Sequence, residues 1–216
     1  MKILDLKKDL KYLYGPSAKK PEIVQVPRLH FAMIDGAIEK GYEPGNSPSF
    51  QEATQALYAI SYTLKFMLKK RKTYAIDYPV MALQGLWWVE DGRFDITVKD
   101  NWFYTLMILQ PDVITQGVFE EGRAEVRRKK GDNASLSNLR LADFEEGTCV
   151  QVMHMGPYAT EPATVERMRD FARENGYRDL IGSGIGKHHE IYLGDPRKAD
   201  PAKLKTILRH PVEKVN

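Results

Sequence analysis

The chain has 216 residues, of which 43% are hydrophobic and 28% are charged, and its formal net charge is +3. This length suits one large domain or two fused small ones, and the composition is that of an ordinary globular protein. The near balance of 32 basic and 29 acidic residues, without an arginine-rich face, argues against nucleic-acid binding.

Membrane insertion, secretion and disulfide bonding are also disfavoured. No apolar run approaches the roughly 18 residues needed to span a bilayer. The opening run MKILDLKKDLKYLYG is interrupted by charges every few residues, unlike a signal peptide. A lone cysteine, Cys149, excludes an internal disulfide and a cysteine-rich metal site. We therefore expect a soluble, reduced, cytoplasmic protein without a membrane partner.

The N-terminal residues predict an arm followed by a strand. Residues 1–20 are lysine-rich and read as a short amphipathic arm. Residues 22–36 are rich in β-branched and aromatic residues, which predicts a strand with an irregularity at Pro27. Glycines and prolines predict a loop over 41–49.

A long helix is predicted next. Its apolar residues recur at spacings of three and four: Phe50, Ala53, Leu57, Ile60, Leu64, Met67 and Leu68. Ser47 or Ser49 can cap the start of this helix, and Pro48 suits its first turn.

Two strands and a connecting helix follow in the chain. Residues 74–91 and 102–111 predict strands, the second of them rich in aromatic residues. Residues 112–130 predict a helix with Asp112 as its cap, and residues 131–138 predict a polar loop.

The same order of elements then recurs. Residues 147–156 predict a strand, and residues 160–175 predict a helix capped by Thr160. Residues 188–193 and 204–212 predict the last two strands.

This order predicts an α+β fold of two strand-helix-strand-strand modules. Two such modules could pack side by side around a pseudo-twofold axis, and a ligand groove would then form between them. The expected division is an arm over 1–20 and one domain over 21–216. Within that domain the first module spans about 21–111, the connecting helix about 112–130 and the second module about 145–213. Interfaces between such halves are common ligand sites.

Several short runs together resemble the GyrI-like small-molecule-binding family, in its stand-alone branch rather than the branch fused to DNA-binding helices. The runs are EIYL at 190–193 with DPR at 195–197, GLWW at 85–88, MILQP at 107–111, and HMGPY at 154–158 with EPA at 161–163. The resemblance covers nearly the whole chain.

The resemblance implies a groove with a buried glutamate ringed by aromatic side chains, and the matching glutamate is Glu190. It implies a lipophilic, aromatic, often cationic small molecule as the partner, as in multidrug binding, and no cofactor. Some stand-alone relatives resemble hydrolases that open the cyclopropane ring of DNA-alkylating antibiotics, which would be a detoxification role. Regulation of a protein partner is a third possibility.

Glu190 and Tyr192 lie on one side of the predicted strand, since side chains alternate along a strand. An outward-facing glutamate is the plain alternative. In an aromatic pocket, desolvation would raise the pKa of this carboxyl and a bound cation would lower it again. If there is chemistry, Glu190 could direct water as a general base, with Tyr192 or Tyr158 assisting.

Five aromatic residues are further candidates for the ligand groove. Trp87 and Trp88 are adjacent, so one of them can face the groove while the other packs in the core. Trp102 and Tyr104 share a face of the next strand, and Tyr158 stands at the entrance of a helix. Packing alone is the alternative for each of them.

Gln84 departs from the family pattern, which commonly has a glutamate at this position before the GLWW run. A glutamine can orient a ligand or a water molecule, but it cannot act as a base. This favours binding over hydrolysis, with Gln84 as a ligand-binding residue. We expect no metal site, because the neighbouring His188 and His189 point to opposite sides of a strand.

Overall fold

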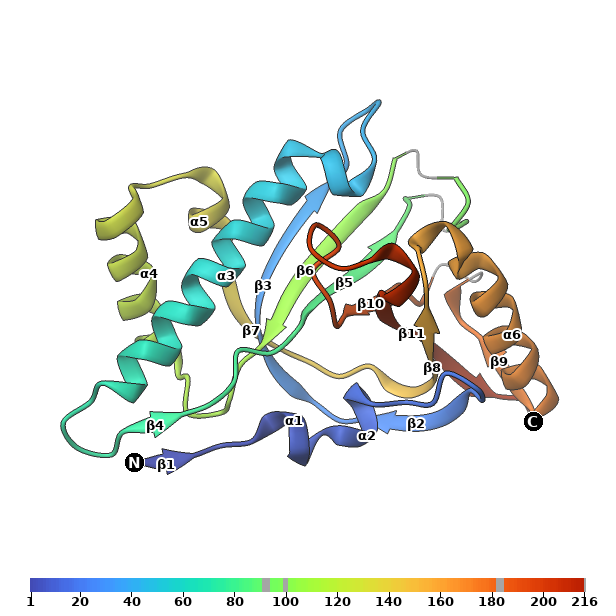
Figure 1. Cartoon of the computed structure of the whole chain (residues 1–216), viewed down its shortest axis with the longest axis horizontal. Helices are drawn as coiled ribbons and strands as arrows, with labels where there is room; N and C mark the ends of the chain where they lie inside the picture. The colour runs from blue at the N-terminus through green and yellow to red at the C-terminus, as the bar shows by residue number, and fades with distance from the viewer. Residues whose placement is uncertain (91–93, 99–100, 182–184, 216) are drawn as a thin grey trace.

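The computed structural model describes residues 1–90, 94–98, 101–181 and 185–215, and an antiparallel sheet forms its centre (Figure 1). The strand order is β2-β8-β11-β10-β5-β6-β3-β7, with β9 paired to β11. The strands of this sheet are β2 (Glu22–Val26), β3 (Leu29–Ala37), β5 (Leu83–Trp88), β6 (Phe103–Leu109), β7 (Arg140–Phe144), β8 (Gly147–Met155), β9 (Tyr177–Asp179), β10 (His188–Tyr192) and β11 (Lys205–Lys214). A separate parallel pair joins β1 (Lys2–Ile3) to β4 (Ile76–Asp77).

The helices are α1 (Leu6–Asp9), α2 (Lys11–Tyr14), α3 (Pro48–Lys69), α4 (Gln116–Lys130), α5 (Ala134–Asn138) and α6 (Glu161–Glu174). Short 3-10 turns are η1 (Pro44–Asn46), η2 (Tyr158–Thr160) and η4 (Pro201–Lys203). In Figure 1, α3 lies over one half of the sheet and α6 over the other, while α4 and α5 lie on the outer side of α3. None of the helices in the described part of the chain is long and apolar enough to cross a membrane.

Helices α3 and α6 cover the same face of the sheet. Phe50 of α3 stacks on Trp87 of β5, and Val165 of α6 packs in one cluster with Leu208 of β11. Leu208 is the cross-strand partner of Glu190, and Glu190 in turn pairs with Gly85, two residues before Trp87. Residues paired directly across neighbouring strands share a face. The two helices therefore flank the strands that carry Glu190.

The predicted α+β class is confirmed, and the two strand-helix-strand-strand series appear in the sheet as β3-α3-β5-β6 and β8-α6-β10-β11. They meet where β10 and β5 pair antiparallel, which we call the seam. The predicted twofold axis and domain boundaries stay predictions.

The long helix starts as predicted: the side chain of Ser47 accepts a hydrogen bond from the backbone N–H of Phe50, and Pro48 opens the first turn. The cap of α4 was predicted wrongly at Asp112, because Thr115 accepts the hydrogen bond from Val118 instead.

Some predicted segments are divided in the structure. The strand expected over 22–36 is two strands, β2 and β3, because Pro27 has no N–H to continue the ladder. The strand expected over 74–91 reduces to β4 and β5, and the loop expected over 131–138 contains α5. Strand β7, which pairs with β3, was not predicted.

The N-terminal arm is folded onto the sheet rather than trailing from it. Leu13 is fully buried against Val26 and Cys149. Tyr14 packs beside Ile191, whose side chain points to the face opposite Glu190. The arm therefore covers the sheet on the side that α3 and α6 leave open.

Candidate functional site

Glu190 lies at the seam with its carboxylate buried and hydrogen-bonded. The residue is only 6% exposed, on a strand that is paired on both sides, with β5 and β11. The Tyr192 hydroxyl donates to Oε2 of Glu190 at 2.6 Å, and Nε2 of His188 lies 3.0 Å from Oε1. Both carboxylate oxygens therefore have polar partners.

Two phenols stand beside this carboxylate. Tyr192 accepts a hydrogen bond from the indole N–H of Trp87 at 3.1 Å, and its ring meets the ring of Tyr158 edge to face at 6.1 Å. Burial and the negative charge of Glu190 raise the pKa of Tyr192 well above its ordinary value, and the same two causes raise the pKa of Tyr158. Both hydroxyls therefore stay protonated and can donate hydrogen bonds.

An aromatic wall lies behind these groups. Trp87 is 1% exposed; its ring stacks on Phe50 at 5.7 Å and lies 5.3 Å from Trp102 and 5.9 Å from Tyr104. Trp102 and Tyr104 are themselves buried, so they support Trp87. The structure thus brings together Glu190, Tyr192, Tyr158, Trp87, Trp102 and Tyr104 among the residues predicted from the sequence.

Trp88 and Gln84 are not part of this cluster, because strand alternation points them to the opposite face of the sheet. Trp88 stacks on Phe103, and Nζ of Lys187 lies 3.3 Å from the centre of its ring. Gln84 donates from its side-chain nitrogen to the Tyr14 hydroxyl at 2.7 Å, and its Oε1 lies 3.0 Å from Nε2 of His189.

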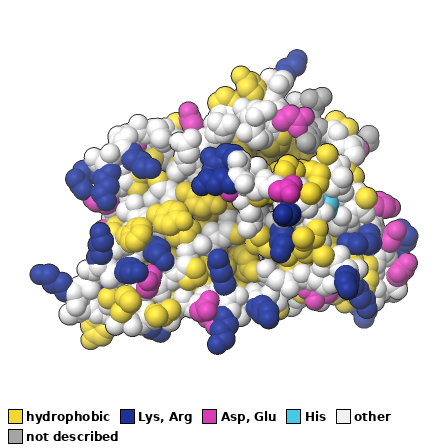
Figure 2. Space-filling model, in the orientation of Figure 1, with side chains coloured by type: hydrophobic (Ala, Val, Ile, Leu, Met, Phe, Trp, Pro, Cys, Tyr) yellow, Lys and Arg dark blue, Asp and Glu magenta, His cyan; other side chains and the backbone are white. Residues whose placement is uncertain are grey.

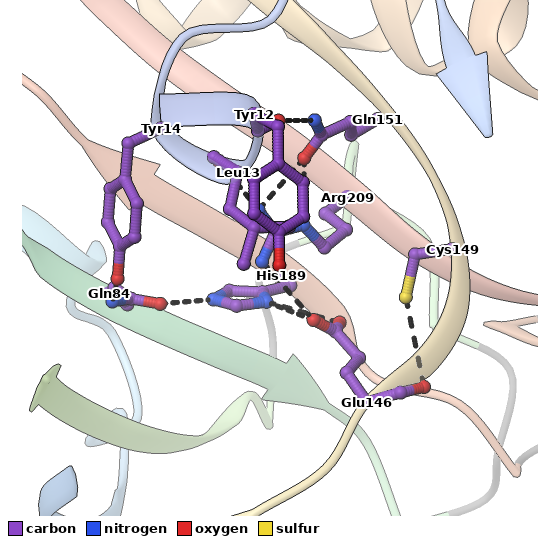
Figure 3. Close-up of polar contacts among 9 residues, drawn as sticks. All are labelled: Tyr12, Leu13, Tyr14, Gln84, Glu146, Cys149, Gln151, His189 and Arg209. Carbon is purple, nitrogen blue, oxygen red and sulfur yellow. Dashed lines mark hydrogen bonds and ion pairs between the residues drawn. The ribbon is translucent and has the colours of Figure 1, made fainter. Parts of the chain in front are cut away.

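Gln84 belongs to a second buried polar cluster, on the arm side of the sheet (Figure 3). Oε2 of Glu146 lies 2.9 Å from Nδ1 of His189 and 3.5 Å from Nη1 of Arg209. Burial alone would raise the pKa of Glu146, but His189 and Arg209 lower it, so this carboxylate stays ionised. Arg209 donates to the backbone oxygen of Leu13 at 2.7 Å. The cluster thus ties the arm to the sheet.

Sequence reasoning missed the polar residues behind Glu190. Nδ1 of His188 lies 2.7 Å from Nε2 of His210, and Nδ1 of His210 lies 2.7 Å from Oδ2 of Asp179. Alternation in the run HHEIYL places His188 and Glu190 on one face, which was the available signal. The registers in which β11 pairs with β10 and with β9 bring His210 next to His188 and Asp179 next to His210. Nothing in the sequence indicates these registers.

The site therefore offers a buried carboxylate, two protonated phenols and the edge of an indole. A carboxylate so placed can hold a cation or orient a water molecule. A tyrosine ring beside it can stack on a flat ligand.

Comparisons with known proteins identify the family of this chain. The GyrI-like small molecule binding domain matches residues 19–213. A solved structure of an uncharacterised conserved protein from Listeria innocua is 43% identical, with a TM-score of 0.83 over 97% of this chain and 100% of that chain. No curated protein matches the chain.

Two further solved structures are informative. A protein described as a hydrolase from Listeria innocua is 39% identical, with a TM-score of 0.80 over 97% of this chain and 100% of that chain. The EcmrR C-terminal domain is 14% identical, with a TM-score of 0.52 over 91% of this chain and 98% of that chain, which shows a shared fold alone. The chain belongs to the GyrI-like small-molecule-binding domain family.

Proposed function

We propose that this protein binds lipophilic, aromatic and often cationic small molecules, with Glu190 as the anchor. The observation that carries the proposal is the buried carboxylate of Glu190, 6% exposed and hydrogen-bonded by Tyr192. A buried carboxylate is costly unless an opposite charge or hydrogen bonds compensate it. An organic cation supplies such a charge, and the nearby ring of Tyr158 adds cation–π attraction of about 0.5–2 kcal/mol.

Exposed aromatic side chains on α3 offer a stacking surface for an aromatic ligand. Tyr58, Tyr62 and Phe66 follow one another at every fourth position and stack at 6.3 and 6.4 Å. Tyr62 and Phe66 are 48% and 45% exposed, and Figure 2 shows hydrophobic side chains gathered over α3 and toward the middle of the molecule. Phe50, on the same helix, contacts Trp87 of the site.

A fluorescence titration with ethidium, a planar permanent cation, tests the anchor. Replacing a charge-assisted contact in Glu190→Gln should weaken binding by roughly 1–3 kcal/mol, about 5- to 150-fold. Glu166→Gln is the matched control, because Glu166 is an exposed glutamate of α6. An unchanged dissociation constant in Glu190→Gln would remove the anchor role.

The hydrolase description of the relative from Listeria innocua favours hydrolysis as a second candidate function. The family resemblance of the sequence suggests the reaction, which is opening of the cyclopropane ring of DNA-alkylating natural products. Water would add to a ring carbon, the strained C–C bond would break, and its electron pair would move into the conjugated carbonyl, which takes up a proton. Glu190 would direct the water and accept its proton. Tyr158 would donate to the carbonyl, since its hydroxyl stays protonated. Tyr192, whose hydroxyl hydrogen is donated to Glu190, would assist by holding that carboxylate in place.

Incubation with a cyclopropane-bearing alkylator tests this candidate. Mass spectrometry should find the hydrated, ring-opened product with the wild-type protein, and Glu190→Gln should abolish it. A rate equal to that of buffer alone would leave the binding function only.

A further inference from the structure

A chain of side chains leads from Glu190 to the edge of the sheet, through two buried histidines. Oε1 of Glu190 lies 3.0 Å from Nε2 of His188, Nδ1 of His188 lies 2.7 Å from Nε2 of His210, and Nδ1 of His210 lies 2.7 Å from Oδ2 of Asp179. His188 and His210 are 1% and 0% exposed. All three distances are hydrogen-bond distances.

Each of these three contacts needs one hydrogen between its two atoms, since two lone pairs facing each other at such distances would repel. A neutral imidazole carries one ring hydrogen, and an ionised carboxylate carries none. Two neutral histidines therefore supply two hydrogens for three contacts. None of the four groups is an amide that could rotate to exchange donor and acceptor. The chain is fully hydrogen-bonded only when it holds a third proton.

The third proton belongs at the Glu190–His188 end of the chain. Burial lowers the pKa of His210 to about 4, so His210 stays neutral. Burial opposes ionisation of Asp179, but the hydrogen bond from His210, the backbone N–H of Ile181 and the charge of Arg169 lower the pKa of Asp179 to about 2. Nε of Arg169 lies 3.2 Å from Oδ2 of Asp179, so the two side chains form an ion pair. Glu190 and His188 then form, with their proton, a pair of zero net charge.

The other titratable groups around Glu190 do not change their protonation state near neutral pH. Tyr192 on its own strand and Tyr158 of η2 stay protonated. Burial and the charge of Arg167 lower the pKa of His154 of β8, although the charge of Glu190 raises it. The charges of Glu161 of α6 and Asp195 raise the pKa of Tyr158, as the charge of Glu190 does. Asp179 raises the pKa of His210, and Arg169 lowers it.

We propose that a cationic ligand binds at Glu190 in exchange for this proton, with His188, His210 and Asp179 as positioning residues that hold the proton in the free protein. The proposal rests on the ligand-binding function proposed above. Either a proton or a cation balances the buried carboxylate, whereas both together would leave an uncompensated positive charge in the site. The site thus prefers ligands with a single positive charge.

Titration calorimetry with ethidium measures the exchange directly. At one pH, in phosphate and in Tris, the difference in binding heat reports the protons released, because these buffers differ in ionisation enthalpy. About one proton should be released per ethidium, and the dissociation constant should fall about tenfold per pH unit as the pH rises. Equal heats in the two buffers, with binding intact, would overturn the exchange and leave the binding function. No binding in any buffer would overturn both.

Asp179→Asn tests the chain at its far end, away from the ligand. The Asn oxygen can keep the hydrogen bond from the backbone N–H of Ile181, which is 2.8 Å long in the wild type, while its NH2 group takes the place of Oδ2 and donates to His210. Arg169, which donates to Oδ2 in the wild type, then turns to the solvent that already reaches its side chain. Each histidine can then donate toward Glu190, and two ring hydrogens satisfy the chain. Proton release should fall toward zero and the affinity should become nearly independent of pH.

Asp170→Asn is the matched control, because Asp170 forms a surface ion pair with Arg173 on the same helix as Arg169. It should release as many protons as the wild type. A thermal melt checks that both variants are folded. Full proton release by Asp179→Asn would overturn the role of the chain.

Discussion

The hydroxyl of Tyr192 joins two buried groups, because it donates to Glu190 and accepts from the indole N–H of Trp87. Tyr192→Phe removes one partner from each of them. A buried polar group left without its partner costs roughly 1–3 kcal/mol, so the free energy of unfolding should fall by at least that amount. Urea denaturation measures the change. Tyr74→Phe is the control, since Tyr74 is 92% exposed, and an equal loss in both variants would contradict the role of Tyr192.

Residue-level prediction succeeded where the periodicity of one strand was sufficient. Alternation places Glu190 and Tyr192 on one face, and their hydrogen bond confirms it. It failed where two distant strands had to be set in register. His210 reaches His188 from β11, and Asp179 reaches His210 from β9. A shift of one residue in either pairing would turn these side chains to the other face, and nothing in the sequence sets that register.

At the scale of elements, Gly85 of β5 gives the seam room for the site. A Cβ atom at Gly85 would lie 2.8 Å from Nε1 of Trp87 and 3.2 Å from the hydroxyl oxygen of Tyr192. Gly85→Ala should therefore push these two side chains apart, lower the free energy of unfolding by roughly 1–3 kcal/mol and weaken ethidium binding. Gly45→Ala is the control, because a Cβ atom there meets nothing within 4 Å. Unchanged binding and stability in Gly85→Ala would contradict this role of Gly85, because the side chains of Trp87 and Tyr192 would then be able to move away from the added Cβ atom.

The N-terminal arm contributes to the core through Leu13, which is fully buried against Val26 and Cys149. Leu13→Ala removes these contacts and should lower the free energy of unfolding by roughly 2–5 kcal/mol. Tyr12→Ala is the neighbouring control, since Tyr12 is 48% exposed and should lose much less. Both are measured by urea denaturation. A small effect at Leu13 would show that the arm is dispensable for stability.

Elements with several agreeing local signals were predictable. Helix α3 has apolar periodicity, a serine cap and a proline in its first turn, and all three are present in the structure. The arm, α5 and β7 lack such signals. Helices of four or five residues do not establish a period, and α1 and α2 depend on packing against the sheet. Strand β7 is stabilised by its pairing with β3, which is a tertiary contact.

At the scale of the whole molecule, the two halves share one sheet through the pairing of β10 with β5. The repeated order of elements in the sequence predicted which strands and which helix make up each half. It did not predict that β10 and β5 would be the strands that join the halves, because that pairing depends on tertiary packing. Glu190 therefore lies at the strand pair that joins the series β3-α3-β5-β6 to the series β8-α6-β10-β11. A ligand bound at Glu190, as proposed, would contact both halves and should stabilise the whole fold by mass action.

Buried histidines make the stability of the whole molecule depend on pH. Burial lowers the pKa of His210 from 6.5 to about 4, and burial lowers the pKa of His154 as well. Between these values the unfolded chain binds protons that the folded chain does not. The stability from these neutral histidines is thus complete above pH 6.5 and is lost as the pH falls toward 4.

Each such proton changes the free energy of unfolding by about 1.4 kcal/mol per pH unit. The free energy of unfolding should therefore be lower at about pH 5 than at about pH 7, by roughly 1–3 kcal/mol. Urea denaturation at the two pH values measures the difference, and an equal slope against urea at both would show that the same surface is exposed. Equal stability at both pH values would contradict neutral histidines at His154 and His210, and with them the proton count on which the exchange at Glu190 depends.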